Sequence, residues 1–148
     1  MAALEGNASR GVESLSISAR RDLVRDLRAL ETEFETAAKA RRIDYDRVFE
    51  SHNAFHERLV GACAGPRHRA LIETVRPQVD RYEWVYAPLV GPDYSATFAE
   101  HAAIIRAVRD GSPDQTERAV VANWNLGAAR LSVVIGKAGS RGDWLAAK

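Results

Sequence analysis

The chain has 148 residues, a formal net charge of +1, an apolar fraction of 46% and a charged fraction of 28%. These values are typical of one globular domain and exclude a disordered or fibrous chain. The chain has 21 basic and 20 acidic residues. This near balance argues against direct nucleic-acid binding, because domains that bind nucleic acids usually carry a clear excess of basic residues. We expect no membrane partner, because no apolar run approaches the ~20 residues that span a bilayer. The single cysteine, Cys63, excludes an internal disulfide and favours the cytoplasm.

All predicted elements are helices, because alternating strand patterns are absent and Ala, Arg, Glu and Leu dominate the sequence. The first is a short helix at about 3–15, which Gly6 and Gly11 weaken. The second begins behind Ser18 as its N-cap and extends to about Arg42.

A third helix is predicted at about 45–63, with Asp44 as its N-cap. Three more follow at about 67–89, 95–110 and 113–136. Pro77 should kink the fourth helix, because proline removes one backbone donor and crowds the preceding turn. Gly91 and Pro92 mark the loop before the fifth helix.

The sequence therefore predicts an all-α fold, an antiparallel bundle of six to seven helices. There is no internal repeat, low-complexity tract or obvious linker in the sequence. We expect a single domain over residues 1–148, with the ends at 1–3 and 137–148 frayed.

Three of the four histidines fall on faces that the helical periodicity assigns to the core: His52, His56 and His101. His52 and His56 are four residues apart on one helix face, the spacing at which two imidazoles hold one metal ion. A buried imidazole needs a partner for each ring nitrogen, and a divalent metal would serve all three rings. The alternative is that each ring bonds a backbone carbonyl or a water. His68 lies near a helix start and outside this set.

Three other side chains are candidates for contact with a ligand. Arg76 suits a ligand carboxylate if it faces the interior, although a surface salt bridge is the commoner use of such an arginine. Tyr82 and Trp124 would line a small-molecule pocket, or would belong to the ordinary core. Cys63 continues a buried helix face, which predicts an inert thiol.

A resemblance to a known family rests on three segments, HNAFHERLVGACAGP (52–66), EHAAIIRAVRDGS (100–112) and AVVANWNLGAARL (119–131). Their text, order and spacing resemble the FCD domain, the C-terminal effector-binding domain of FadR-type GntR transcription regulators. The likeness runs from about Leu4 and Glu5 to about Leu131. It implies an antiparallel helical bundle with a central cavity, in which one Asp and three His hold a divalent metal that helps to bind a small carboxylate. It also implies a homodimer.

The resemblance transfers to this chain position by position. The family's Asp falls on His52, its first and second His on His56 and His101, and its third His on Asn123. His52 is still a competent ligand, whereas the amide of Asn123 is a poor ligand for zinc-like metals and would instead bond a water or the ligand. The resemblance therefore implies three imidazoles and open coordination positions.

Regulators of this family carry an N-terminal winged helix-turn-helix, and this sequence starts close to the first FCD helix. It is therefore a fragment of a regulator or a domain that lives alone. The first function that we expect is metal-dependent binding of a small organic acid, with zinc as the first choice and nickel, cobalt or iron as others. The second is a metal-dependent enzyme acting on a small carbonyl or carboxylate compound, with Glu100 or Glu50 as weak candidates for the general base. The third is a metal-free interaction module.

Overall fold

The computed structural model describes residues 1–90 and 93–138, and these form six α-helices and one 3₁₀ turn, η1. Their bounds are α1 (Ala2–Ser9), η1 (Arg10–Ser14), α2 (Ile17–Ala38), α3 (Tyr45–Cys63), α4 (Pro66–Val90), α5 (Ser95–Asp110) and α6 (Pro113–Ala138). The described residues contain no strand, so the all-α prediction is confirmed. The loop predicted at Gly91 and Pro92 lies outside the described residues. Of the predicted frayed ends at 1–3 and 137–148, residues 139–148 also lie outside them, whereas residues 2–3 and 137–138 belong to α1 and α6.

Two helix starts show how well local capping chemistry can be predicted. α3 begins where expected, because the Asp44 side chain accepts a hydrogen bond from the backbone N–H of Arg47 at 3.2 Å. α2 begins earlier than expected. Its cap is Ser16, whose Oγ accepts from the backbone N–H of Ala19 at 3.1 Å, and not Ser18, which lies inside the helix.

α2 also ends earlier than predicted, at Ala38 and not near Arg42. Ile43 packs against a small core cluster that includes Phe34 and Val48. The chain must leave the helix before Ile43 in order to bring that side chain back to the cluster. Tertiary packing therefore overrides the helical propensity of the preceding residues.

The single helix predicted at 3–15 is wrong, because the segment is divided into α1 and η1. The reason lies at Gly11, where a Cβ atom would stand only 2.1 Å from the carbonyl oxygen of Cys63. The backbone of η1 thus approaches the end of α3 more closely than any side chain would allow. This approach inserts Val12 into the main core, where it has no exposed surface.

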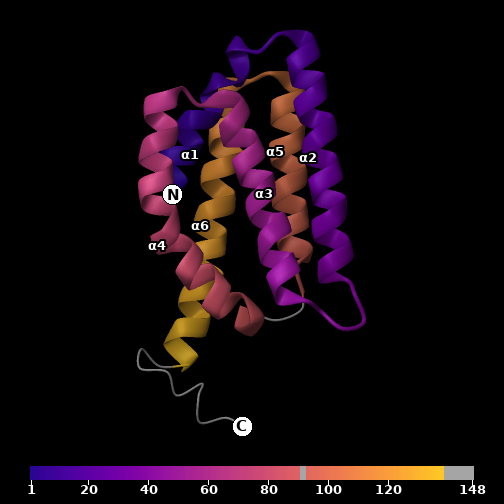
Figure 1. Cartoon of the computed structure of the whole chain (residues 1–148), viewed down its shortest axis with the longest axis vertical. Helices are drawn as coiled ribbons and strands as arrows, with labels where there is room; N and C mark the ends of the chain where they lie inside the picture. Colours follow the sequence, from indigo (N-terminus) through magenta and orange to yellow (C-terminus); the bar gives the residue numbers. More distant parts are fainter. Residues whose placement is uncertain (91–92, 139–148) are drawn as a thin grey trace.

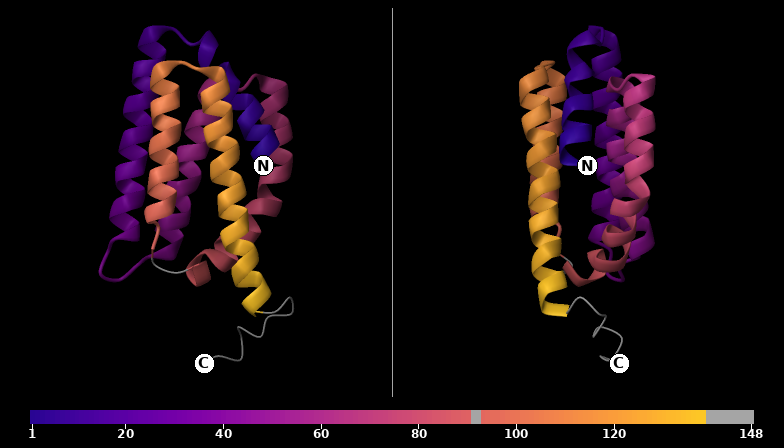
Figure 2. Two further views of the ribbon diagram at one scale, coloured as in Figure 1. Left: turned by 180° about the vertical axis from the view of Figure 1, so that it is seen from behind. Right: turned by 90° about the vertical axis from the view of Figure 1, so that its left-hand side faces the viewer.

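α4 is continuous through Pro77 and Pro88. Figures 1 and 2 show that its ribbon bends in its C-terminal part and crosses α6 at the lower end of the bundle. Prolines inside a helix remove backbone donors and crowd the preceding turn, so they account for a bend of this kind.

The helices form a bundle in which the short α1 lies between α6 and α4 (Figure 2, right). α2 packs against α3 and α5, and α5 packs against α6. The main core joins side chains from η1, α2, α3, α5 and α6: Val12, Leu23, Val24, Leu27, Phe55, Leu59, Ile104, Ile105, Val108, Val120 and Trp124. Because α1 is enclosed in this way, a polar side chain on it enters the interior of the bundle.

Among the described helices, α6 is long and apolar enough over Pro113–Gly136 to cross a membrane by length and composition, with a mean hydropathy of 1.2. The statement that no segment approaches this length is therefore corrected. One such helix is weak evidence for a membrane span, because helices of a soluble core pass the same test. In this structure α6 packs against α1, α4 and α5 as a helix of the bundle.

Candidate metal centre

Three imidazoles meet between α3 and α5, as the sequence predicted. One ring nitrogen from each of His52, His56 and His101 lies within 4.8 Å of the other two. The ring centroids of His52 and His56 are 4.9 Å apart, and those of His52 and His101 are 5.3 Å apart. His56 and His101 have no exposed surface. Such a set of converging nitrogen atoms can hold one divalent metal ion.

The hydrogen bonds of the two buried rings leave one nitrogen of each without a protein partner. Nδ1 of His56 lies 2.9 Å from Oε2 of Glu5, and Nδ1 of His101 lies 2.5 Å from Oε2 of Glu31. Nε2 of both rings is buried and has no hydrogen-bond partner in the part of the chain that the structure describes. When a neutral imidazole donates its Nδ1–H to an ionised carboxylate, Nε2 carries the free lone pair. This is the arrangement typical of metal-binding histidines, so the donor set fits a divalent metal.

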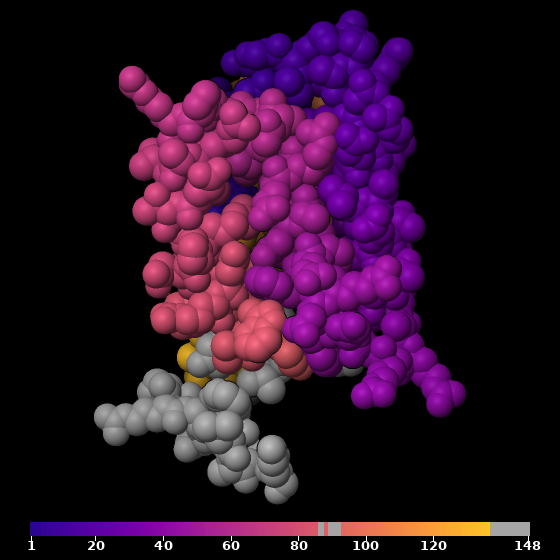
Figure 3. Space-filling view, viewed as in Figure 1, coloured from indigo at the N-terminus to yellow at the C-terminus, as the bar shows by residue number. Residues whose placement is uncertain are grey.

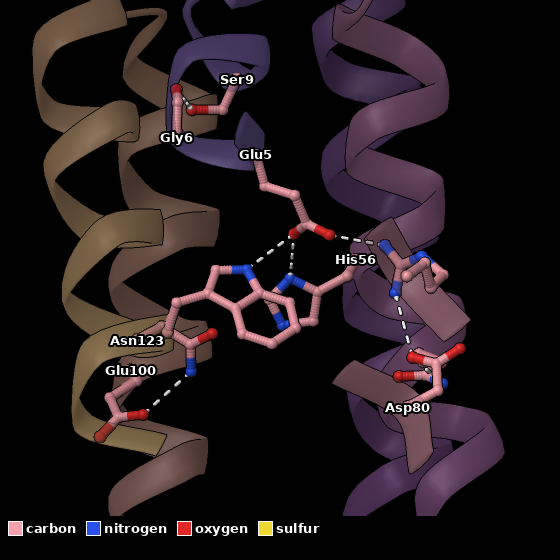
Figure 4. A network of polar contacts seen from close by, with 10 residues as sticks. Glu5, Gly6, Ser9, His56, Asp80, Glu100 and Asn123 are labelled. Carbon is pink, nitrogen blue, oxygen red and sulfur yellow. Dashed lines mark hydrogen bonds and ion pairs between the residues drawn. The ribbon is translucent and has the colours of Figure 1, made fainter. Parts of the chain in front are cut away.

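Glu5 is a fully buried carboxylate surrounded by donors (Figure 4). Its Oε2 accepts hydrogen bonds from Nδ1 of His56 and from Nε1 of Trp124, the latter at 2.8 Å. Its Oε1 accepts a hydrogen bond from Nη2 of Arg76 at 2.5 Å. Burial alone would raise the pKa of Glu5, but His56, Arg76 and Trp124 together lower it to about 2. Glu5 is therefore ionised at neutral pH and fixes the orientation of His56.

Glu31 has a different environment although it plays the same part toward His101. Burial and the neighbouring charge of Glu35 raise the pKa of Glu31 to about 8. Its Oε1 is buried and has no hydrogen-bond partner among the described residues. No arginine or lysine forms an ion pair with Glu31 in this part of the chain, and the charge of Lys39 lowers the pKa less than burial and Glu35 raise it.

Burial also keeps two of the imidazoles neutral. It lowers the pKa of His52 to about 3, with the charge of His56 as the next cause. Burial and the neighbouring His52, His56 and Arg130 lower the pKa of His101 well below its usual value. Neutral imidazole is the form that binds a metal, so His52 and His101 can bind one at pH 7 without first losing a proton.

A pocket of about 100 Å³ lies beside the imidazoles, between α4 and the lower parts of α2, α3, α5 and α6. Figure 3 shows α4 and α3 side by side on the face of the molecule that it views. The pocket is lined by Phe34, Val48, Phe49, His52, Glu83, Asp93, Tyr94, Thr97, Asn123, Trp124, Gly127, Arg130 and Leu131. Of the three histidines, His52 lines this pocket and His56 and His101 do not, so the expected central cavity for metal and ligand is not confirmed.

Asn123 and Trp124, two of the predicted ligand-binding residues, line this pocket. The amide nitrogen of Asn123 donates to Oε2 of Glu100 at 2.9 Å (Figure 4). Arg130 donates to both oxygens of Glu100, at 2.7 and 2.9 Å. Glu100 is therefore engaged by an ion pair and an amide, which does not suit the general-base role considered for it. The contacts of Asn123 and Trp124 with a ligand stay predictions.

Arg76 and Tyr82, the other two ligand-binding candidates, do not line the pocket. Arg76 does face the interior, but its guanidinium is bound to Glu5. Tyr82 is 47% exposed. Cys63 is half-buried, and burial raises the pKa of its thiol to about 11, in line with an inert side chain. Contact of Arg76 and Tyr82 with a ligand stays a prediction.

Sequence reasoning did not identify Glu5, Glu31 or Glu83 as parts of this site. Glu31 gave a readable signal, because it is four residues after Leu27 and three before Phe34, on the buried stripe of its helix. A carboxylate on an apolar stripe needs a buried partner. Glu5 gave no such signal, since α1 is short and has no clear apolar face.

A comparison with protein families agrees with this geometry. The family model of the FCD domain matches residues 1–125, and the chain therefore belongs to the FCD domain family. FCD domains are the effector-binding domains of GntR-type regulators, bind small molecules, and often bind a metal. No curated protein and no solved structure matched the chain in the same comparison.

Proposed function

We propose that this FCD domain binds a small organic acid through a divalent metal held by His52, His56 and His101. The observation that carries this proposal is the pair of buried, unpartnered Nε2 atoms of His56 and His101, which converge with a nitrogen of His52. Two buried polar atoms without partners are costly to keep, and a metal would satisfy both. Zinc is the first choice, and nickel, cobalt and iron suit the same donors.

The pocket supports an acid as the ligand only when the metal is present. A bound metal would supply the positive charge that attracts a carboxylate. Among the described residues of the pocket lining the one cation is Arg130, and its guanidinium is already paired with Glu100. Arg76 is likewise paired with Glu5. Recognition of an acid would thus depend on the metal, while Asn123 and Trp124 would contact the rest of the ligand.

The size of the pocket favours a short acid over a drug-sized molecule. Its volume of about 100 Å³ is well below the ~300–1,000 Å³ of sites for drug-sized molecules. The homodimer and the cytoplasmic location expected from the sequence stay predictions.

Metal content tests the first half of the proposal. We would purify the wild-type protein and the His56→Ala and His68→Ala variants without a histidine tag or chelator, and measure bound metals by plasma mass spectrometry. We expect near one metal ion per chain in the wild type and in His68→Ala, and loss of the metal in His56→Ala. Equal metal content in all three proteins would contradict the proposed site.

Ligand binding tests the second half. Isothermal titration of the zinc-loaded protein with a panel of short carboxylic acids should find at least one that binds. The same protein stripped of metal should not bind that acid. Equal affinity with and without zinc would show that the metal does not anchor the ligand.

A further inference from the structure

Glu83 of α4 is a half-buried acid on the lining of the pocket. It lines the pocket together with His52 and Asn123. Its Oε2 is buried and has no hydrogen-bond partner in the described part of the chain. The carboxyl group is also close enough to His56 for the two to interact electrostatically. Glu83 therefore brings a carboxylate oxygen without a hydrogen-bond partner among the described residues to the pocket that His52 lines.

No ion pair joins Glu83 to a basic side chain in the part of the chain that the structure describes. Burial raises its pKa to about 7, and the charges of Asp80 and Glu5 act in the same direction. The charge of Arg76 lowers the pKa of Glu83, but the guanidinium of Arg76 donates a hydrogen bond to Oε1 of Glu5 at 2.5 Å. A buried carboxyl without a counter-charge is costly, and a metal ion in the site would remove that cost.

The donor set also lacks a negative charge. In the resemblance described above, an Asp stands at the position of His52, so the family's site includes one carboxylate. In this chain that position is an imidazole, and the fourth family position is Asn123, whose amide nitrogen is directed at Glu100. Three neutral imidazoles leave a divalent metal with its full charge in a buried place. Zinc prefers four ligands and accepts carboxylate oxygens beside imidazoles.

We propose that Glu83 is the fourth protein ligand of the metal and restores the carboxylate that the change to His52 removes. This inference rests on the proposed function. The group of nitrogen atoms within 4.8 Å of one another contains the three histidines only, so Glu83 reaches the metal by rotating its side chain toward His52. Both residues line the same pocket.

Zinc affinity tests this role without any assay of activity. We would compare the wild type with Glu83→Gln by competition against a chromophoric chelator. The matched control is Glu73→Gln, an exposed glutamate of the same helix. Glu83→Gln should weaken zinc binding by at least ~10-fold, the loss that even an outer partner of a metal ligand causes. Glu73→Gln should bind zinc as the wild type does.

Cobalt provides the second measurement, because its visible absorption reports the ligand set directly. Circular dichroism first establishes that the Glu83→Gln variant keeps the helical content of the wild type. The visible spectrum of the cobalt-loaded protein should then change in Glu83→Gln and stay the same in Glu73→Gln. Unchanged affinity and an unchanged spectrum in Glu83→Gln would overturn the inference while the three-histidine site stands. A wild type that takes up neither metal would overturn this inference and the proposed function together.

Discussion

The two histidine–carboxylate pairs, His56 with Glu5 and His101 with Glu31, share one hydrogen-bond pattern but differ in what surrounds the carboxylate. Glu5 receives hydrogen bonds from three side chains, one of them the arginine Arg76, and its pKa is lowered to about 2. Glu31 contacts His101 with one oxygen, keeps the other unpartnered, and has a pKa raised to about 8. The carboxylate of Glu5 is paired with the cation Arg76, whereas Glu31 forms no ion pair with an arginine or lysine among the described residues.

This difference shows that a hydrogen bond between histidine and carboxylate can stabilise the fold in one place and favour metal binding in another. Glu5 joins α1 to α3, α4 and α6, so its network stabilises the bundle whether or not a metal is bound. Glu31 joins α2 to α5 through His101 alone. Ionisation of Glu31 would become favourable when a metal ion binds Nε2 of His101, on the other side of the ring.

The largest expected effect follows from Glu5→Gln. This change removes the charge that balances Arg76 in the interior, and breaking a buried ion pair costs roughly 3–5 kcal/mol. Urea unfolding of the metal-free protein should show a loss in the free energy of unfolding of that order. The control is Glu13→Gln, an exposed glutamate in η1, which should leave stability unchanged. Equal stability of Glu5→Gln and the wild type would contradict the structural role of this network.

The pH dependence of the free energy of unfolding should report the ionisation of Glu5. The pKa of Glu5 is about 2 in the folded state against an ordinary value of 4.5, so the unfolded state binds the proton more tightly. The resulting stabilisation, about 3 kcal/mol, is therefore present above pH 4.5 and is lost as the pH falls through about 2. The stability difference between the wild type and Glu5→Gln should shrink over this range. A difference that stays constant from pH 5 to pH 2 would contradict the lowered pKa.

Glu31→Gln should separate metal binding from folding. Because the pKa of Glu31 is about 8, its carboxyl is mostly neutral at pH 7, and an amide replaces it at little cost to the metal-free fold. Zinc affinity should fall by about 10–100-fold, because the partner that orients and polarises His101 is weakened. The measurement is zinc titration beside urea unfolding, with the exposed Glu33→Gln as control. A large loss of metal-free stability with unchanged zinc affinity would reverse the assignment of the two pairs.

The smallest effect is expected from Trp124→Phe. This change removes one of the three donors to Glu5 and keeps an aromatic ring beside His56. His56 and Arg76 still hold the carboxylate, so the free energy of unfolding should fall by only about 1–2 kcal/mol. A loss of unfolding free energy as large as that of Glu5→Gln would mean that the indole N–H, and not Arg76, contributes most of the stability of this network.

The parts of the site that could be predicted from the sequence are those set by local geometry. His52 and His56 are one helical turn apart, so periodicity alone places them together, and His101 falls on an inward face. Glu5 could not be placed in this way. Its partners His56, Arg76 and Trp124 are 51, 71 and 119 residues away, and only the packing of α1 between α4 and α6 brings them together. The division of the first helix escaped prediction for the same reason, because it depends on contact between Gly11 and Cys63.

The central claim is that the three imidazoles hold one metal ion. Anomalous diffraction from a crystal of the zinc-loaded protein, recorded on both sides of the zinc absorption edge, tests it most directly. The account predicts one strong peak at about 2.0–2.1 Å from a nitrogen of each of His52, His56 and His101. An empty position between the three rings, with zinc elsewhere or not bound, would contradict it.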